Sequence, residues 1–228
     1  MTTSHRAPLS AVIIAIAVGM LVPPSTAAAQ AAEGDSAHPA LLDPSLAREP
    51  APETFKVKLE TSKGEILIDV VRKWAPNGAD RFYNLVKSGY FDDTAFFRVI
   101  DGFMAQVGLH GNPEVTAAWS RAPIPDDPPK KSNTRGMVTF AMRSSPNSRT
   151  SQFFINYGDN SYLDKSGFAP IGKVVDGIKV ADSLYSGYGE GAPRGTGPSQ
   201  SLLTQQGNAY LEAQFPKLDY IVRATIVE

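Results

Sequence analysis

The chain has 228 residues, of which 42% are hydrophobic and 20% are charged, and its formal net charge is -1. This is the balance of an ordinary globular protein, long enough for one domain with a substantial core. The chain lacks the strong excess of basic residues that is typical of nucleic-acid-binding proteins, so this class of function is excluded. Because the sequence contains no cysteine, disulfides, thiolate nucleophiles and cysteine-ligated zinc are excluded as well.

The N-terminal residues carry the features of a secretory signal peptide. A short basic start is followed by an uncharged apolar run and a small-residue cleavage site, formed in turn by His5 and Arg6, by residues 11–22, and by Ala27 and Ala29. We expect cleavage after residue 29, with a site at Ala29 and Ala31 as the second option. A membrane anchor is the alternative, but the apolar run is shorter than the roughly 20 residues needed to span a bilayer. The sequence therefore predicts a periplasmic or secreted protein.

Residues 30–53 contain Pro39, Pro44, Pro50 and Pro52 and show no periodic apolar pattern. A segment of this composition is typical of a flexible linker. We expect the folded domain to span residues 54–228.

Short strands dominate the predicted domain. Alternation of apolar and polar residues predicts a hairpin first, and short strands separated by Gly and Pro follow it. In chain order, the expected strands cover residues 55–60, 65–71, 94–100, 103–107, 137–142, 152–156, 171–174 and 218–226.

Only two helices are expected among these strands. The first begins at Pro76, has Phe82, Leu85 and Val86 on one face, and ends near Gly89. The second covers about residues 176–185. A glycine-rich stretch over 186–200 is interpreted as a mobile surface loop. The pattern does not match alternating parallel βαβ units, and an antiparallel barrel capped by helices fits it better.

Three separated blocks resemble, in order, the cyclophilin family of peptidyl-prolyl cis-trans isomerases. The blocks are Phe97–Gln106 followed by Gly108, Gly136–Ala141 with Ser151–Ile155, and Leu163-Asp164 with Gly172–Gly177. Together with the hairpin and the first helix, the resemblance covers about residues 55–185. The order and spacing of the blocks make a chance similarity implausible. Together with the predicted signal peptide, they suggest an exported, bacterial form of the family.

The resemblance implies a mainly β fold, namely a closed eight-stranded antiparallel β-barrel capped by two α-helices. It also implies an open groove outside the barrel that binds an extended peptide around an X-Pro bond. Arg98 takes the place of the catalytic arginine. The positions that match the proline pocket are Phe103, Met104, Phe154 and Leu163, and those that match the residues holding the peptide backbone are Gln106, Ala141 and Gln152.

Strand alternation supports this site independently of the resemblance. Gln152 and Phe154 belong to one face of a predicted strand, whereas Phe153 and Ile155 belong to the other. If Phe153 and Ile155 fill the barrel, an amide and an aromatic ring stand together outside it. That combination suits a peptide-binding site better than a core.

An arginine at position 98 suits the expected reaction. When an X-Pro amide twists, its nitrogen gains a lone pair that resonance had delocalised, and a guanidinium can donate a hydrogen bond to it. Arginine is permanently charged and carries its donors in a rigid fork, so it is better adapted to this task than lysine. The competing interpretation is an ordinary strand arginine exposed to solvent.

Three groove positions depart from the usual family pattern. Tyr162 stands where many members have Trp, Phe168 stands about where His is common, and Met142 replaces a frequent Asn. We include all three among the substrate-binding positions and predict retained activity with an altered peptide preference.

The expected partners are proline-containing segments of unfolded or partly folded proteins. We expect a monomer that binds no nucleic acid and is not inserted stably in a membrane after signal cleavage. We also expect no cofactor and no metal site: His5 and His38 precede the predicted domain, and the paired Asp126 and Asp127 are interpreted as turn residues.

Two other functions remain open from the sequence. One is a binding module or chaperone-like protein that uses the same groove without needing catalysis, and an intact Arg98 argues against it. The other is a barrel with a small ligand inside, against which the large inward side chains Phe153 and Ile155 argue.

Overall fold

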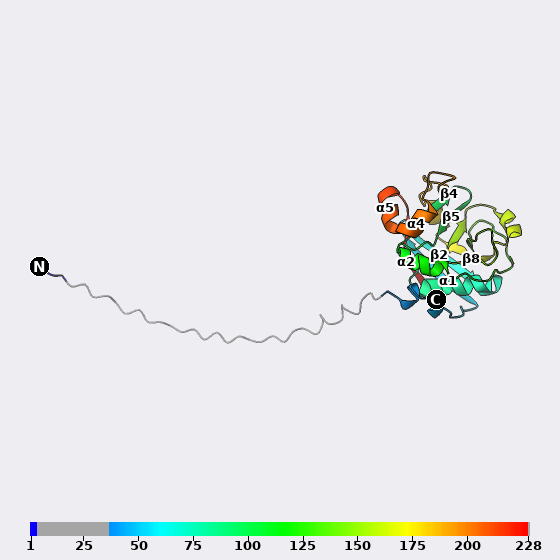
Figure 1. The fold of residues 1–228 in the computed structure, drawn as a ribbon, viewed down its shortest axis with the longest axis horizontal. Coiled ribbons are helices and arrows are strands. Elements are labelled where there is room, and N and C mark those ends of the chain that lie inside the picture. The colour runs from blue at the N-terminus through cyan, green and yellow to red at the C-terminus, as the bar shows by residue number, and fades with distance from the viewer. Residues whose placement is uncertain (4–36, 228) are drawn as a thin grey trace. The chain divides into compact units, whose positions relative to one another are not determined.

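The computed structural model describes residues 1–3 and 37–227 of the chain. Residues 1–36 and 37–228 form two separate units, and the fold described below is that of the second unit (Figure 1). The predicted signal peptide therefore lies outside the described residues, apart from its first three. Among the described helices, none combines the length and the apolar character needed to cross a membrane.

A nine-stranded antiparallel sheet forms the centre of the domain. Its strands follow the order β3-β9-β1-β2-β8-β6-β7-β5-β4. Their bounds are β1 (Thr54–Thr61), β2 (Gly64–Val71), β3 (Thr94–Ala95), β4 (Arg98–Ile100), β5 (Met104–Val107), β6 (Met137–Phe140), β7 (Phe153–Asn156), β8 (Pro170–Asp176) and β9 (Tyr220–Val227).

The hairpin β1–β2 forms as the alternating sequence predicted. Val57 and Leu59 of β1 and Ile68 of β2 are fully buried, while the residues between them are partly exposed. Thr61 pairs with Gly64 across a two-residue connection. Gly64 has a φ of +131°, a conformation that favours glycine.

The predicted closed eight-stranded barrel is wrong, because the sheet is open and has nine strands. The segment 94–100, expected as one strand, is divided at Phe96 and Phe97 into β3 and β4. β3 pairs with β9 and β4 pairs with β5, and no ladder joins β3 to β4 in the described part of the chain. Phe96 packs into the main core and Phe97 into a second cluster on the other side. The sheet ends at β3 on one side and at β4 on the other, so these two edge strands are joined by the chain through Phe96 and Phe97 and by no ladder among the described residues.

Five α-helices are found in the described residues, where two were predicted. The first, α1 (Pro76–Lys87), begins and ends close to its predicted bounds, but the second predicted helix is shortened to α3 (Ile178–Asp182). The helices that were not predicted are α2 (Pro113–Ser120), α4 (Gln200–Gln206) and α5 (Asn208–Gln214). Short 3₁₀ helices cover Pro39–Leu41, Pro44–Leu46, Arg72–Trp74 and Ser161–Ser166.

The main core lies between the concave side of the sheet and α1. Phe82 of α1 is fully buried, and its ring makes edge-to-face contacts with Phe140 of β6 and Phe153 of β7. Ile155 belongs to the same core. Phe153 and Ile155 therefore fill the interior, as strand alternation predicted.

A second, smaller core holds α4 and α5 against the sheet. In Figure 1 these two helices lie together near α2, and the contacts between α2 and α4 agree with that view. Leu203 and Leu211 pack with Phe215, Leu218 and Phe97. Burial of these side chains gives the C-terminal helices a fixed place on the domain.

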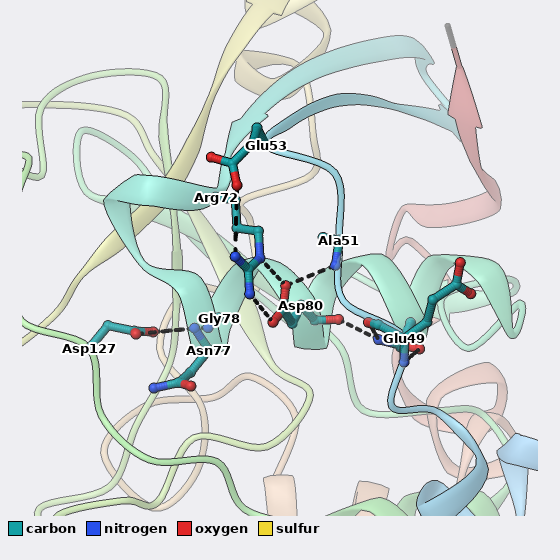
Figure 2. Close-up of polar contacts among 9 residues, drawn as sticks. Glu49, Ala51, Glu53, Arg72, Asn77, Gly78, Asp80 and Asp127 are labelled. Carbon is teal, nitrogen blue, oxygen red and sulfur yellow. Dashed lines mark hydrogen bonds and ion pairs between the residues drawn. The ribbon is translucent and has the colours of Figure 1, made fainter.

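Residues 37–53 differ from the flexible linker that their prolines predicted. The Ala51 amide donates to Asp80 of α1 at 2.9 Å, and Asp80 also pairs with Arg72, as Figure 2 shows. Further along, the Glu49 amide donates to Asn84 Oδ1, and Asn84 Nδ2 donates back to the Glu49 carbonyl. Earlier in the segment, the Trp119 indole of α2 donates to the Leu41 carbonyl, so the prolines belong to an ordered segment that contains two short 3₁₀ helices. Residues 30–36 of the predicted linker lie outside the described residues.

Candidate active site

A groove with a volume of about 620 Å³ is lined by residues of several strands and helices. Strands β4, β5 and β7 contribute one wall, and α4 contributes residues of another. Its lining includes Arg98, Phe103, Met104, Gln106, Ala141, Met142, Gln152, Phe154, Leu163 and Phe168.

Strand register brings the polar and aromatic members of the groove together. Arg98 of β4 stands opposite Gln106 of β5, and Gln106 in turn stands opposite Phe154 of β7. Paired residues on adjacent antiparallel strands place their side chains within about 4.5–5.5 Å of one another. Three residues that are far apart in the sequence therefore form one row across three strands.

A chain of hydrogen bonds follows this row. Arg98 Nη1 donates to Gln106 Oε1 at 3.0 Å, and Gln106 Nε2 donates to Gln152 Oε1 at 2.8 Å. Gln106 is only 7% exposed, so its amide orientation is set by these two contacts. The guanidinium also lies over the Phe103 ring, with its carbon 5.7 Å from the ring centroid.

The apolar part of the groove is built around Phe154. Its ring makes an edge-to-face contact with Phe168, with the centroids 5.8 Å apart. Phe103, Met104 and Leu163 line the same groove. The arrangement offers an aromatic and aliphatic surface beside a fixed guanidinium, which suits an apolar ring attached to a polar amide.

Buried amides behind the groove fix its apolar wall. Asn160 Nδ2 donates to the Phe103 carbonyl, and Asn133 Nδ2 donates to the Phe168 carbonyl. Asn133 also donates to Asp164 from its backbone and its side chain. Burial raises the pKa of Asp164, but the hydrogen bonds from Ser132 and Asn133 outweigh it and leave that pKa below its usual value. The wall is thus held through backbone carbonyls as well as by packing.

The family model described as "Cyclophilin type peptidyl-prolyl cis-trans isomerase/CLD" matches residues 56–200, which is more than half of the chain. The chain belongs to the cyclophilin family. Its enzymatic activity is accordingly that of a peptidyl-prolyl cis-trans isomerase.

Several cyclophilin relatives are isomerases of bacteria. The peptidyl-prolyl cis-trans isomerase of Acinetobacter baylyi is 39% identical over 134 residues, which cover 56% of this chain and 70% of that protein. Peptidyl-prolyl cis-trans isomerase A of Dickeya dadantii is 36% identical over 155 residues, covering 65% and 81% of the two chains. Isomerase B of Escherichia coli is 34% identical over 136 residues, covering 56% and 82%.

Solved cyclophilin structures share the fold. A cyclophilin-type isomerase of Cryptosporidium parvum superposes with a TM-score of 0.56 at 22% identity, covering 77% of this chain and 98% of that one. A second structure of that protein, determined in the presence of the dipeptide Ala-Pro, gives a TM-score of 0.54.

Of the site residues predicted from the sequence, all line the groove of this cyclophilin except Tyr162. It is 60% exposed and lies in the 3₁₀ helix Ser161–Ser166, next to the groove residue Leu163. Residues of a tight helical turn point in different directions, so Leu163 faces the groove while Tyr162 faces solvent.

Sequence reasoning missed a group of groove residues that come from the C-terminal segment. Gln200, Ser201, Thr204 and Gln205 of α4 line the groove, and so does Arg194 in the loop before α4. The i, i+4 spacing of the α4 residues was a usable signal, because it puts polar side chains on one helical face. Without the second core, however, nothing in the sequence places that face beside the groove.

Glu190 was missed as well, although it contacts the central arginine. Arg98 Nε donates to Glu190 Oε1 at 2.8 Å and Arg98 Nη2 donates to Glu190 Oε2 at 2.7 Å. The glycines of residues 186–200 predicted a mobile loop, yet the Gly197 amide donates to the Glu190 carbonyl and the loop is folded against the groove. A lone glutamate in a glycine-rich stretch gives no sequence signal for this pairing.

Proposed function

We propose that this groove binds extended proline-containing segments of exported proteins during their folding and isomerises their X-Pro bonds, with Arg98 as the catalytic residue. The observation that carries the proposal is the row Arg98–Gln106–Gln152 beside Phe154, in which a fixed cationic donor adjoins an apolar surface. The Ala-Pro dipeptide present with the Cryptosporidium parvum relative is in keeping with such a substrate.

The chemical task is to lower the barrier to rotation about a partly double C–N bond. That barrier is about 18–20 kcal/mol, and uncatalysed exchange takes roughly 10–100 s. Turnover on the order of 10³ s⁻¹ requires a barrier lower by roughly 5.5–7 kcal/mol. No bond is made or broken, so the groove has only to bind the twisted amide more tightly than either planar form.

Arg98 supplies part of this difference. In the twisted amide the proline nitrogen becomes pyramidal, and a guanidinium N–H donates to its lone pair. A preorganised donor in a site shielded from water contributes roughly 2.7–4 kcal/mol. Gln106 and Phe103 hold the guanidinium in place from two sides, so little reorientation is required when the amide twists.

The remaining stabilisation comes from holding both sides of the rotating bond. Phe154, Met104 and Leu163 grip the proline ring and exclude water from the amide. Gln152 and the backbone near Ala141 anchor the preceding residue. When the ring is fixed and the chain on the other side is anchored, binding energy favours the twisted form.

The export part of the proposal is supported by the sequence of residues 1–29. A short basic start, an apolar run too short to span a bilayer and small residues at the cleavage position form a secretory signal. Expression of the full chain in a bacterial host tests it. We expect mature protein in the periplasm or the medium with its N-terminus at residue 30, and a cytoplasmic protein that keeps residue 1 would overturn the export proposal.

The catalytic part is tested with Arg98→Ala in a cis-trans exchange assay on a proline peptide. We expect the native chain to accelerate exchange strongly and the variant to lose at least about 100-fold in kcat/KM, given the contribution assigned to one preorganised donor. Arg143→Ala is the matched control, because it removes an arginine from the groove edge and leaves Arg98 intact. If both variants keep the native rate, or if the native chain is inert, the proposed mechanism is wrong.

A further inference from the structure

The Arg98 guanidinium is bound by a carboxylate from a distant part of the chain. Glu190 accepts from Arg98 Nε at 2.8 Å and from Nη2 at 2.7 Å, a two-point contact across 92 sequence positions. The two side chains are only 17% and 29% exposed. A bidentate contact of this kind is geometrically specific as well as strong.

This contact determines which N–H bonds of Arg98 are left for a substrate. A guanidinium has five N–H bonds in a fixed planar arrangement. Glu190 takes those along the Nε–Nη2 edge, and Gln106 takes one on Nη1. The second bond on Nη1 has only a weak contact, with Met104 Sδ at 3.9 Å, and one bond on Nη2 has no partner among the described residues. These two bonds remain for a substrate. A two-point contact along one edge also fixes the rotation of the guanidinium plane, which a single hydrogen bond does not.

Glu190 stands behind Arg98 and does not occupy the groove. Arg98 lines the groove, whereas Glu190 is not among the lining residues. The carboxylate therefore leaves the space of the substrate free. Its own position is fixed, because Oε1 also accepts from the Gly191 amide at 3.0 Å and its carbonyl accepts from the Gly197 amide at 2.9 Å.

The glycines of this loop allow that close folding. A Cβ at position 195 would lie 2.3 Å from the Glu190 carbonyl oxygen, and one at position 197 would lie 3.0 Å from it. Side chains at these positions would push the loop away from Glu190. The glycines thus allow the loop to fold compactly, with the Glu190 carboxylate in contact with Arg98.

We propose that Glu190 is a positioning residue of the isomerase, which fixes the plane of the Arg98 guanidinium so that its free N–H bonds face the twisted amide. The proposal rests on the proposed role of Arg98. Pairing with a carboxylate weakens the field of the guanidinium somewhat, but arginine stays charged in either case. The advantage is that folding already orients the guanidinium for the transition state, so the reaction barrier does not include the entropic cost of orienting it.

Glu190→Gln in the full chain tests this role, because glutamine keeps the shape and removes the charge and one acceptor. We expect kcat/KM to fall on the order of tenfold, in line with the cost of misorienting a catalytic group. The loss should lie in kcat, with peptide affinity within about twofold of the native chain, since Glu190 does not line the groove. Glu190→Asp, which keeps the charge on a shorter side chain, should recover part of the rate.

Two further variants separate positioning from a structural role. Glu212→Gln removes an exposed glutamate from α5 in the same C-terminal segment and should leave the rate unchanged. In an Arg98→Lys background, Glu190→Gln should change the residual rate less than twofold, because lysine has no planar fork to orient. A purely structural role would lower both backgrounds by the same factor.

The outcomes distinguish this inference from the proposed function. If Arg98→Ala abolishes activity while Glu190→Gln keeps or raises kcat/KM, Arg98 is catalytic and the positioning role of Glu190 is overturned. The same conclusion follows if the two substitutions are additive in the lysine background. If Arg98→Ala itself is as active as the native chain, the failure belongs to the proposed function.

Discussion

Asp127 and Arg149 form an ion pair with 3.1 Å between Oδ2 and Nη1, and the two side chains are only 3% and 1% exposed. Asp127 also accepts from the amides of Asn77 and Gly78 in the first turn of α1, as Figure 2 shows. A buried carboxylate at this place satisfies two helix N–H groups that have no partner within the helix. The loop before β6 is thereby tied to the start of the helix that covers the core.

Asp127→Asn should destabilise the domain strongly. The substitution removes the more deeply buried of the two carboxylates that contact the Arg149 guanidinium, the other being Asp126 at 3.3 Å, and breaking a buried pair costs about 3–5 kcal/mol. For a domain of this size the melting temperature should fall by roughly 10 °C, as measured by calorimetry. Asp126→Asn is the comparison, since Asp126 contacts the same guanidinium at 3.3 Å but is 36% exposed and should cost less; equal effects of the two substitutions would contradict this account.

Asp80→Asn should loosen residues 37–53 without unfolding the domain. Asp80 accepts from the Ala51 amide and from Arg72, and the hydrogen bonds lower its pKa despite the opposing effect of burial. We expect a loss of about 1.5–3 kcal/mol in stability, as for one hydrogen bond to a charged group. Amide hydrogen exchange at Ala51 should become at least tenfold faster. Glu53→Gln is the control, because Glu53 is 81% exposed and lies 3.9 Å from Arg72; equal exchange in both variants would show that Asp80 does not hold the segment.

The sequence pattern predicted the structure correctly where a feature depends on one strand or one hairpin alone. The period of two in β1 and β2 predicted the hairpin, and the same period separated Phe153 and Ile155 from Gln152 and Phe154. These cases share one property, namely that burial of one face is visible along a few consecutive residues.

Features that depend on distant contacts were not predictable in this way. The division of the strand at Phe96 and Phe97 accompanies burial of the two rings in different cores, and one of these cores includes residues of α4 and α5. Helices of seven residues have weak periodicity, so neither was visible in the sequence. The order of residues 37–53 likewise comes from side chains of α1, such as Asp80 and Asn84, and not from their own composition.

Isomerase activity should depend on pH through Glu190. Hydrogen bonding to Arg98 lowers the pKa of the Glu190 carboxyl in the folded protein, against the smaller opposing effect of burial. The ion pair is therefore complete above the ordinary glutamate pKa of about 4.3 and is lost as the pH falls through the lowered folded value. Arg98 and Arg194 are the charged groups that face Glu190.

A pH profile of kcat/KM tests this dependence. As the pH falls below the ordinary glutamate pKa and through the lowered pKa of Glu190, the native chain should lose rate in excess of any loss from unfolding, because protonated Glu190 no longer fixes the guanidinium. Glu190→Gln should lack this step. Asp164 also has a lowered pKa near the groove, but it is present in both proteins, so the difference between the two profiles isolates Glu190. Identical profiles would contradict the assignment.

The groove should prefer peptides with an acidic residue near the proline. Arg143 and Arg194 line it and are exposed, and within the described residues they form no ion pair. Arg98 is compensated by Glu190, and none of the groove-lining residues described is an aspartate or a glutamate. The groove therefore carries two positive charges that form no ion pair in the described part of the chain, although Arg194 also faces Glu190.

Matched peptides that differ only in Glu, Gln or Lys beside the X-Pro bond measure this preference. We expect kcat/KM to be highest for Glu and lowest for Lys, with roughly a tenfold range at low ionic strength, because exposed charge pairs contribute about 0.2–1 kcal/mol each. The range should shrink at 0.5 M salt, where the screening length is only about 4 Å. Combining Arg143→Gln with Arg194→Gln should remove the preference and leave the rate for the Gln peptide nearly unchanged. An order that persists in this double variant would show that the preference arises elsewhere, for example at Met142 and Phe168, the apolar residues that also line the groove.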